Sequence, residues 1–263
     1  MRKFALTAAS AVLLLPALAL AQSALVGTWK ADLGNIQLPT KPSRYLLEHG
    51  VYHCQTCAPT YAVKADGQDH KVTGHPYYDS VSITVVDAST IEETDKKGGK
   101  TVTTGKTTVS SDGKTIQFDF SDSSDSNGAP VVGNGEATRV AKGPAGSHAI
   151  SGSWRTTKLS NISDNGLLVT YALDGTKLKM TNPTGQSYSA PLDGTDAPFM
   201  GDPGQTSVAI RRIDDSTFDE TDKRDGKVIG TAHITVSPDG KTLTVAWTDK
   251  LRGSSGSYKA NKQ

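Results

Sequence analysis

The sequence predicts an all-β fold built from two similar halves, and three observations support this. The stretch from Val81 to Asp122 recurs without a gap from Val208 to Asp249, 127 residues later. Within each copy, apolar and polar residues alternate with a period of two, as in strands that bury one face. Asp-Gly and Gly-Gly pairs, which are typical of tight hairpins, separate the alternating runs. A repeat of this length constrains the architecture before any single residue is interpreted.

The first 21 residues predict a cleaved signal peptide. Residues 1–3 form a short cationic start, residues 4–20 an apolar run, and residues 19–21 a small-x-small cleavage site. The mature chain is therefore expected to begin at Gln22 and to be periplasmic or secreted. No later stretch is apolar enough to predict a membrane span.

Charge balance argues against a polyanionic partner. The chain carries 28 Lys and Arg against 27 Asp and Glu, and removing Arg2 and Lys3 changes the formal balance from +1 to −1. Both signs are interspersed, which argues against binding to nucleic acid or to an acidic membrane surface. No nucleophile elbow, metalloprotease motif or phosphate loop appears, and no motif indicates a cofactor.

Each copy predicts a meander of about eight short antiparallel strands. Apolar side chains alternate with polar ones over residues 115–120 and 242–248, and hairpins carrying Asp-Gly precede both runs at residues 110–114 and 237–241. Asp-Gly supplies the positive φ that a tight hairpin requires, so these strand pairs are expected to be antiparallel. Strands in such a sheet must close or stack to bury one face and to remove their edges.

The repeat also divides the chain. A Gly-x-Trp-basic element opens each copy, at residues 27–30 and 152–155. We therefore expect a first barrel over residues 22–140, a Gly- and Pro-containing linker over 141–149, and a second barrel over 150–263. The alternative is one larger barrel or β-sandwich shared by both copies.

The two Gly-x-Trp elements and the Ser-x-Asp-Gly-Lys-Thr hairpins carry a resemblance to a known family. A Gly-x-Trp on the first strand followed by an antiparallel meander resembles the calycins, which include lipocalins and fatty-acid-binding proteins, and the GTWK start resembles secreted bacterial lipocalin-like proteins. The resemblance implies two tandem up-and-down barrels, each with a Trp that closes one end. It also implies a closing Arg late in each copy, for which Arg139 and Arg252 are the candidates, although neither aligns clearly.

The two cysteines, Cys54 and Cys57, lie in a segment that differs between the copies. An exported protein with an even cysteine count favours a disulfide between them. A metal site with His53 or His75, a redox-active pair and two free thiols are the alternatives. The metal site lacks a second cysteine pair and a fixed spacing to the histidines.

Inward polar residues are the second candidate site. Strand alternation from Val208 places Arg212 on the core face, and Glu220 beyond the next turn is expected on the same face. The two side chains would then pair inside the barrel, and the resemblance to fatty-acid-binding proteins implies that Arg212 holds an anionic ligand. Glu93 is the equivalent of Glu220 and lacks such a partner. The alternative places the pair at the barrel rim or outside.

The acidic runs 92–95 and 219–222 are expected on a solvated face. Successive side chains of a strand point to opposite faces, which argues against convergence of these carboxylates on a calcium ion.

Three functions fit these features. The first is an exported binding module that holds a small apolar or amphipathic ligand in a barrel. The second is an envelope structural or interaction protein whose barrels are filled by their own side chains; interior volume distinguishes the two. The third is a hydrolase or isomerase that uses a carboxylate and one of His49, His53, His70 or His75, and it requires those histidines to gather around a pocket.

Overall fold

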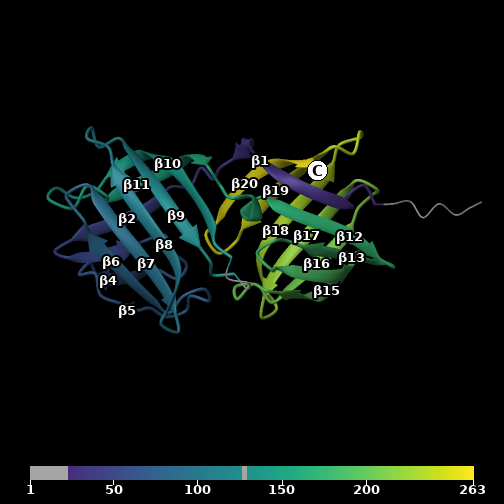
Figure 1. The fold of residues 1–263 in the computed structure, drawn as a ribbon, viewed down its shortest axis with the longest axis horizontal. Coiled ribbons are helices and arrows are strands. Elements are labelled where there is room, and N and C mark those ends of the chain that lie inside the picture. Colours follow the sequence, from purple (N-terminus) through teal and green to yellow (C-terminus); the bar gives the residue numbers. More distant parts are fainter. Residues whose placement is uncertain (1–22, 126–128) are drawn as a thin grey trace, which may run out of the picture.

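The computed structural model describes residues 23–125 and 129–263, so the predicted signal peptide lies outside the described residues. The described residues form 20 strands and one short 3-10 turn, and contain no α-helix. The strands build two ten-stranded antiparallel sheets side by side (Figure 1), which confirms the all-β prediction. The count of about eight strands per copy was too low, because short strands such as β5 (His70–Lys71) carry no alternating signal.

The first sheet, called the first barrel here, is nearly closed. Its strands follow the order β4-β3-β2-β11-β10-β9-β8-β7-β6-β5. Besides β5 they are β2 (Ser43–Glu48), β3 (Val51–Cys54), β4 (Tyr61–Lys64), β6 (Ser80–Val85), β7 (Thr90–Lys97), β8 (Lys100–Val109), β9 (Thr115–Asp122), β10 (Val131–Lys142) and β11 (Gly152–Ser160).

The second sheet closes completely and is called the second barrel. Strand β1 pairs with both β12 and β20 and so completes the ring. Its strands are β1 (Gly27–Gln37), β12 (Leu168–Asp174), β13 (Lys177–Thr181), β14 (Ser187–Pro191), β15 (Asp193–Met200), β16 (Ser207–Arg212), β17 (Thr217–Arg224), β18 (Lys227–Val236), β19 (Thr242–Asp249) and β20 (Ser254–Lys262). The 3-10 turn (Asp164–Gly166) lies between β11 and β12.

Each barrel takes its Gly-x-Trp strand from the other copy of the repeat. In Figure 1 the purple β1 lies among the green and yellow strands of the second barrel, while β11 lies beside β10 in the first. Trp29 is in register with Lys262 of β20, and Trp154 with Arg139 of β10. The sequence repeat therefore identifies equivalent strands without identifying their partners.

The domain boundaries expected from the repeat do not coincide with the sheets. The predicted linker 141–149 begins within β10, and its remaining residues belong to the connection 143–151 between the neighbouring strands β10 and β11 of one barrel. The chain passes between barrels at residues 38–42 and 161–167 instead. The first barrel is thus the continuous segment 43–160, and the second combines β1 with residues 168–262.

A buried Trp closes one end of each barrel. Trp29 and Trp154 are almost fully buried, each in its own apolar core. The indole nitrogen of Trp29 donates to the carbonyl of Leu25 (2.8 Å), and that of Trp154 to the carbonyl of Ile150 (2.7 Å). Both bonds span four residues, so the segment before each Gly-x-Trp strand folds back beneath the ring.

A basic side chain covers each of these Trp rings. The guanidinium of Arg139 lies 3.9 Å from the Trp154 ring centroid, and the ammonium of Lys262 lies 5.0 Å from that of Trp29. Arg139 thus occupies the position expected of a closing Arg. Arg252 does not, because it lies in the β19–β20 turn and bonds to Asp249 (3.1 Å).

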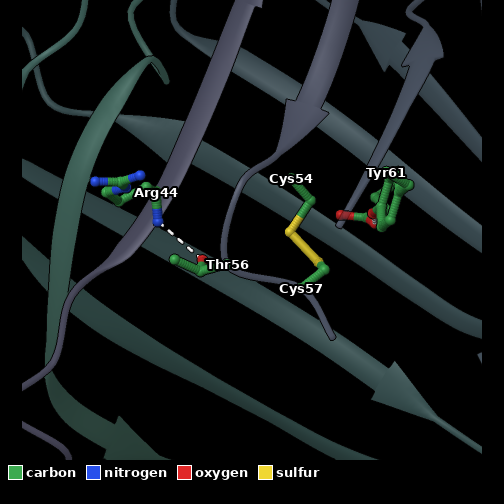
Figure 2. The surroundings of a disulfide bond; sticks show 6 residues. Arg44, Cys54, Thr56, Cys57 and Tyr61 are labelled. Atoms are coloured by element: carbon green, nitrogen blue, oxygen red, sulfur yellow. Dashed lines mark hydrogen bonds between the residues drawn. A yellow bond between two sulfur atoms is a disulfide. The ribbon is translucent and has the colours of Figure 1, made fainter. Parts of the chain in front are cut away.

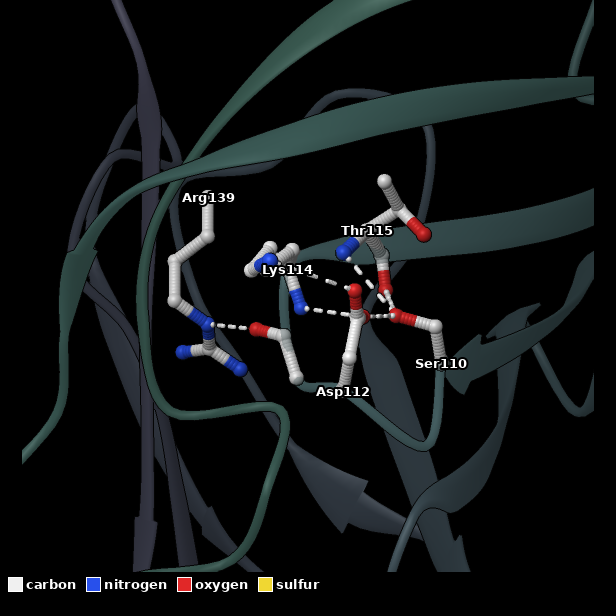
Figure 3. A network of polar contacts seen from close by, with 6 residues as sticks. Ser110, Asp112, Lys114, Thr115 and Arg139 are labelled. Carbon is white, nitrogen blue, oxygen red and sulfur yellow. Dashed lines mark hydrogen bonds and ion pairs between the residues drawn. The ribbon is translucent and has the colours of Figure 1, made fainter.

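The hairpin at residues 110–114 is tied to this closed end. Asp112 accepts hydrogen bonds from the Ser110 hydroxyl (2.7 Å) and the Lys114 amide (3.0 Å), while Gly113 takes the positive φ of 70°. Figure 3 shows that Arg139 also donates to the Gly113 carbonyl. The equivalent Asp239 makes the same two bonds in the second copy. The Asp-Gly hairpins predicted from the sequence are therefore confirmed.

Candidate functional site

Each barrel carries a pair of acidic side chains on its inner face. On β7, Glu93 and Asp95 lie two residues apart and so share one face of the strand. The equivalent residues on β17 are Glu220 and Asp222, 127 residues later. The acidic run 92–95 was predicted to lie on a solvated face. This prediction is wrong for Asp95, which is 8% exposed. Alternation separates neighbouring residues but brings residues i and i+2 together.

A tyrosine hydroxyl satisfies the glutamate of each pair. Tyr61 Oη donates to Glu93 Oε1 (2.8 Å), and Tyr188 Oη donates to Glu220 Oε2 (3.1 Å). Tyr61 and Tyr188 are themselves equivalent in the repeat. The Tyr–Glu contact is therefore a shared feature of both barrels.

The aspartates differ between the barrels. Asp222 Oδ1 accepts a hydrogen bond from Gln205 Nε2 (2.7 Å). Asp95 Oδ1 is buried and has no hydrogen-bond partner. The position equivalent to Gln205 is Tyr78, so the first copy lacks the amide that satisfies the aspartate in the second.

Burial makes these carboxyl groups weak acids. Burial, with the charges of Glu93 and Asp122, raises the pKa of Asp95 to about 8. Burial, followed by the charge of Asp222, raises the pKa of Glu220 to about 8. The pKa values of Glu93 and Asp222 are also raised, chiefly by burial. At neutral pH, Asp95 and Glu220 therefore hold a proton for much of the time.

A cavity of about 290 Å³ lies beside the acid pair of the first barrel. Glu93 and Asp95 line one wall. Glu93 is in register with Gly105 on the neighbouring strand β8, and Gly105 is in register with Phe120 on β9. None of the described residues that line it is basic. Gly105 leaves this space, since a Cβ at that position would meet only the Asp119 carbonyl, at 3.6 Å.

Aromatic rings form the opposite side of this interior. Tyr45 and Tyr52 stack with ring centroids 6.0 Å apart, and Tyr61 follows at 6.3 Å from Tyr52. His75 stacks on Tyr78 at 4.6 Å, is 8% exposed, and has no hydrogen-bond partner at Nε2. The cavity shares Ser43, Tyr45, Trp154 and Thr156 with an inter-barrel space of about 760 Å³.

The second barrel carries larger side chains at two equivalent positions. Ala232 and Trp247 replace Gly105 and Phe120, and they lie next to Glu220 in register. A pocket of about 410 Å³ remains at the mouth of this barrel, where His75 and Tyr78 of the first barrel cover it.

The predicted ligand-binding Arg212 is not beside Glu220. Its guanidinium bonds to Asp215 Oδ1 (2.5 Å) and to the Asp214 carbonyl (3.1 Å) in the β16–β17 turn. The pairing expected between Arg212 and Glu220 is therefore wrong, because Arg212 ends its strand and reaches back to the turn. Glu220 and Glu93 do face the barrel interiors as expected.

The cysteines form a disulfide, as predicted. Figure 2 shows Cys54 bonded to Cys57 in the loop that follows β3, and Cys54 is buried in the core of the first barrel. Thr56 within this loop accepts a hydrogen bond from the Arg44 amide (3.0 Å). The described residues contain no group of three or more His, Cys, Asp and Glu side chains arranged to hold a metal ion.

The histidines near this loop do not form one group. His70 bonds to Asp66 (2.7 Å) at the surface, His49 occupies a turn with φ of 51°, and His75 lies among tyrosines. His233, from the other copy, bonds to Asp219 on the outer face of the second barrel (2.8 Å).

Sequence reasoning identified the glutamates of the site but missed the aspartates and tyrosines. Tyr61, Glu93 and Asp95 all recur after 127 residues, and Glu93 and Asp95 are two residues apart, so they lie on the same face of a strand. This recurrence was the signal available in the sequence.

A scan against protein-family models finds no family that matches the chain, and no curated protein sequence matches it. Among the described residues, no helix has the length and apolar character needed to cross a membrane.

Proposed function

We propose that the chain is an exported binding protein that holds a small ligand inside its first barrel. The observation that carries this proposal is the cavity of about 290 Å³ with the unpartnered Asp95 Oδ1 in its wall. An unsatisfied buried carboxyl oxygen is costly, and a bound molecule that donates to it removes that cost. The volume is near the lower end for ligand pockets, so the ligand is small.

Further features support the lipocalin-like and exported character of the protein. A buried Trp beneath a basic side chain closes the end of each barrel, as the resemblance to secreted lipocalin-like proteins implies. The Cys54–Cys57 disulfide is compatible with an oxidising compartment, where the predicted signal peptide would direct the chain.

The acid pair of the second barrel has a different environment. Glu220 accepts a hydrogen bond from Tyr188 and Asp222 accepts one from Gln205, so both acids have donors within the protein. They also line the pocket of about 410 Å³ at the mouth of this barrel, but no oxygen of this pair is left without a donor as Asp95 Oδ1 is.

The cavity can be tested by filling it. Gly105→Leu adds a side chain toward Glu93 and Phe120, whereas Gly105→Ala introduces the residue of the second copy and serves as the control. We expect native mass spectrometry of the exported protein to detect a retained small molecule in the wild type and in Gly105→Ala. Gly105→Leu should retain at least about tenfold less. Equal retention by Gly105→Leu would place the ligand elsewhere, and an empty wild type would favour filled barrels.

A further inference from the structure

The acid pair beside the cavity of the first barrel points to a chemical class of ligand. We infer that the cavity binds a small organic ammonium ion, a primary amine, whose cationic head is held by Asp95 and Glu93 against the tyrosine wall. This inference rests on the proposed function, and it names the chemical class of the ligand. It replaces the expectation of an apolar or anionic ligand.

The polar groups of the cavity argue against anionic, purely apolar and calcium ligands. An anion would face the carboxyl groups of Glu93 and Asp95, with Asp119 also in the lining and no basic residue among the described lining, so its entry would be opposed. A purely apolar ligand would leave Asp95 Oδ1 without a partner. A calcium ion requires six to eight oxygen ligands, and no group of three ionisable ligands is present in the described chain.

An ammonium ion meets each of these requirements. Its three N–H donors can satisfy Asp95 Oδ1 and the remaining acceptor capacity of Glu93, which already accepts from Tyr61. The stacked rings of Tyr45 and Tyr52 offer aromatic faces to the cation. The organic part would then occupy the side of the cavity beside Phe118 and Phe120.

The comparison between the two copies within one chain supports the assignment. The acid pair, its tyrosine and its strand are shared, but only the second copy supplies an amide to the aspartate. Asp222 therefore has its donor within the protein. Asp95 lines the cavity, and Tyr78 at the position equivalent to Gln205 leaves Asp95 Oδ1 without a hydrogen bond.

Binding releases a proton. The protonated Asp95 carboxyl gives its proton to solvent, and the carboxylate that remains bonds to the ammonium nitrogen, so charge balances. Facing groups that contribute to this titration are Glu93 on the same strand, Asp122 on β9, and Tyr52 and Tyr78 on the aromatic wall. Arg252 of the second barrel acts on Tyr45 and Tyr78 from the inter-barrel side.

Three probes of one carbon skeleton test the inference by calorimetric titration of the full exported chain. They are 2-phenylethylamine, 2-phenylethanol and phenylacetate. We expect the amine to bind at least about tenfold more tightly than the alcohol, and phenylacetate not to bind. Titration of the amine at about pH 7 in two buffers of different ionisation enthalpy should show proton release.

Two matched variants locate the charge effect. Asp95→Asn should weaken amine binding at least about tenfold while leaving alcohol binding unchanged, and Asp222→Asn should change neither. The probe series on the wild type needs no variant, so it decides the ligand class even where Asp95→Asn fails to fold.

The outcomes separate this inference from the proposed function. Tighter binding of the alcohol or of phenylacetate, or amine binding that Asp95→Asn leaves intact, overturns the ammonium assignment. If none of the three probes binds but native mass spectrometry finds a ligand that Gly105→Leu excludes, the barrel is a binding site for another class. Absence of both signals overturns the function as well.

Discussion

At the scale of single residues, the buried acids dominate the chemistry of this protein. Asp95 and Glu220 have pKa values of about 8 in the folded state, well above that of an exposed carboxyl group. The folded chain therefore binds protons that the unfolded chain releases above about pH 4. Both acids are held in place by strand register and not by a counter-ion.

This difference predicts how stability depends on pH. Because the folded-state pKa is raised, the contribution of Asp95 to stability is full below the pKa of the unfolded chain. It is lost as pH rises toward about 8, by roughly 1.4 kcal/mol for each unit of pKa difference. Urea unfolding at about pH 5 and pH 8 should show this loss. Asp95→Asn should make the loss smaller.

Asp32→Asn is the control for this measurement. Hydrogen bonds from Asn35 and Gly34 lower the pKa of Asp32, so it is ionised in both states over this range. A similar change of slope in Asp32→Asn and Asp95→Asn would contradict the assignment of the pH dependence to the buried acid.

At the scale of elements, Arg139 joins three parts of the first barrel. Besides covering Trp154, it donates to the Ser151 and Ala149 carbonyls (2.7 Å each) and to the Gly113 carbonyl. Strand β10, the β8–β9 hairpin and the turn before β11 thus meet at one guanidinium. The corresponding Lys262 can offer a cation to Trp29 but lacks the planar set of donors.

Removing this contact is expected to destabilise the barrel. Arg139→Ala should lower the free energy of unfolding by roughly 3 kcal/mol, because it removes a cation–π contact and leaves carbonyls without their charged donor. Arg252→Ala, the other candidate closing residue, should cost less than about 1 kcal/mol, since its side chain is 58% exposed and bonds only to the adjacent turn. Denaturant unfolding compares the two, and equal losses would argue against the closing role of Arg139.

At the scale of the whole molecule, the exchange of the two Gly-x-Trp strands ties the copies of the repeat together. The second barrel closes through β1, which precedes all strands of the first barrel in the sequence. Further contacts join the barrels, including Tyr77 Oη to Asp202 Oδ1 (2.9 Å) and Lys41 to the Arg252 carbonyl. The second barrel therefore depends on a strand that comes from the first copy of the repeat.

Engineered cysteine pairs can verify the exchange. Ala31 lies opposite Ala260 in the register of β1 and β20, whereas two contiguous barrels would place it opposite Ala137, the partner of the equivalent Thr156. Directly opposite strand residues are close enough for a disulfide. We expect Ala31→Cys with Ala260→Cys to cross-link within one chain, as read by peptide mass spectrometry. Ala31→Cys with Ala137→Cys should not, and the reverse result would restore the contiguous barrels.

The sequence by itself determined the longer strands, their turns and the inward glutamates. Local rules suffice for these features: alternation sets the face of Glu93 and Glu220, and Asp112-Gly113 sets the hairpin. Adjacency of the two cysteines within one turn likewise made their disulfide predictable.

Only the tertiary structure decided which strands are partners and which polar groups are left without one. Trp29 and Trp154 open equivalent strands, so either could fit either barrel, and only the observed pairing of β1 with β12 and β20 and of β11 with β2 and β10 distinguishes the two arrangements. Arg212 ends its strand, where side-chain direction depends on the turn beyond it. Asp95 Oδ1 has no hydrogen-bond partner because Tyr78 occupies the position where the second copy has Gln205. This difference affects Asp95 only because the tertiary structure brings the two distant segments together.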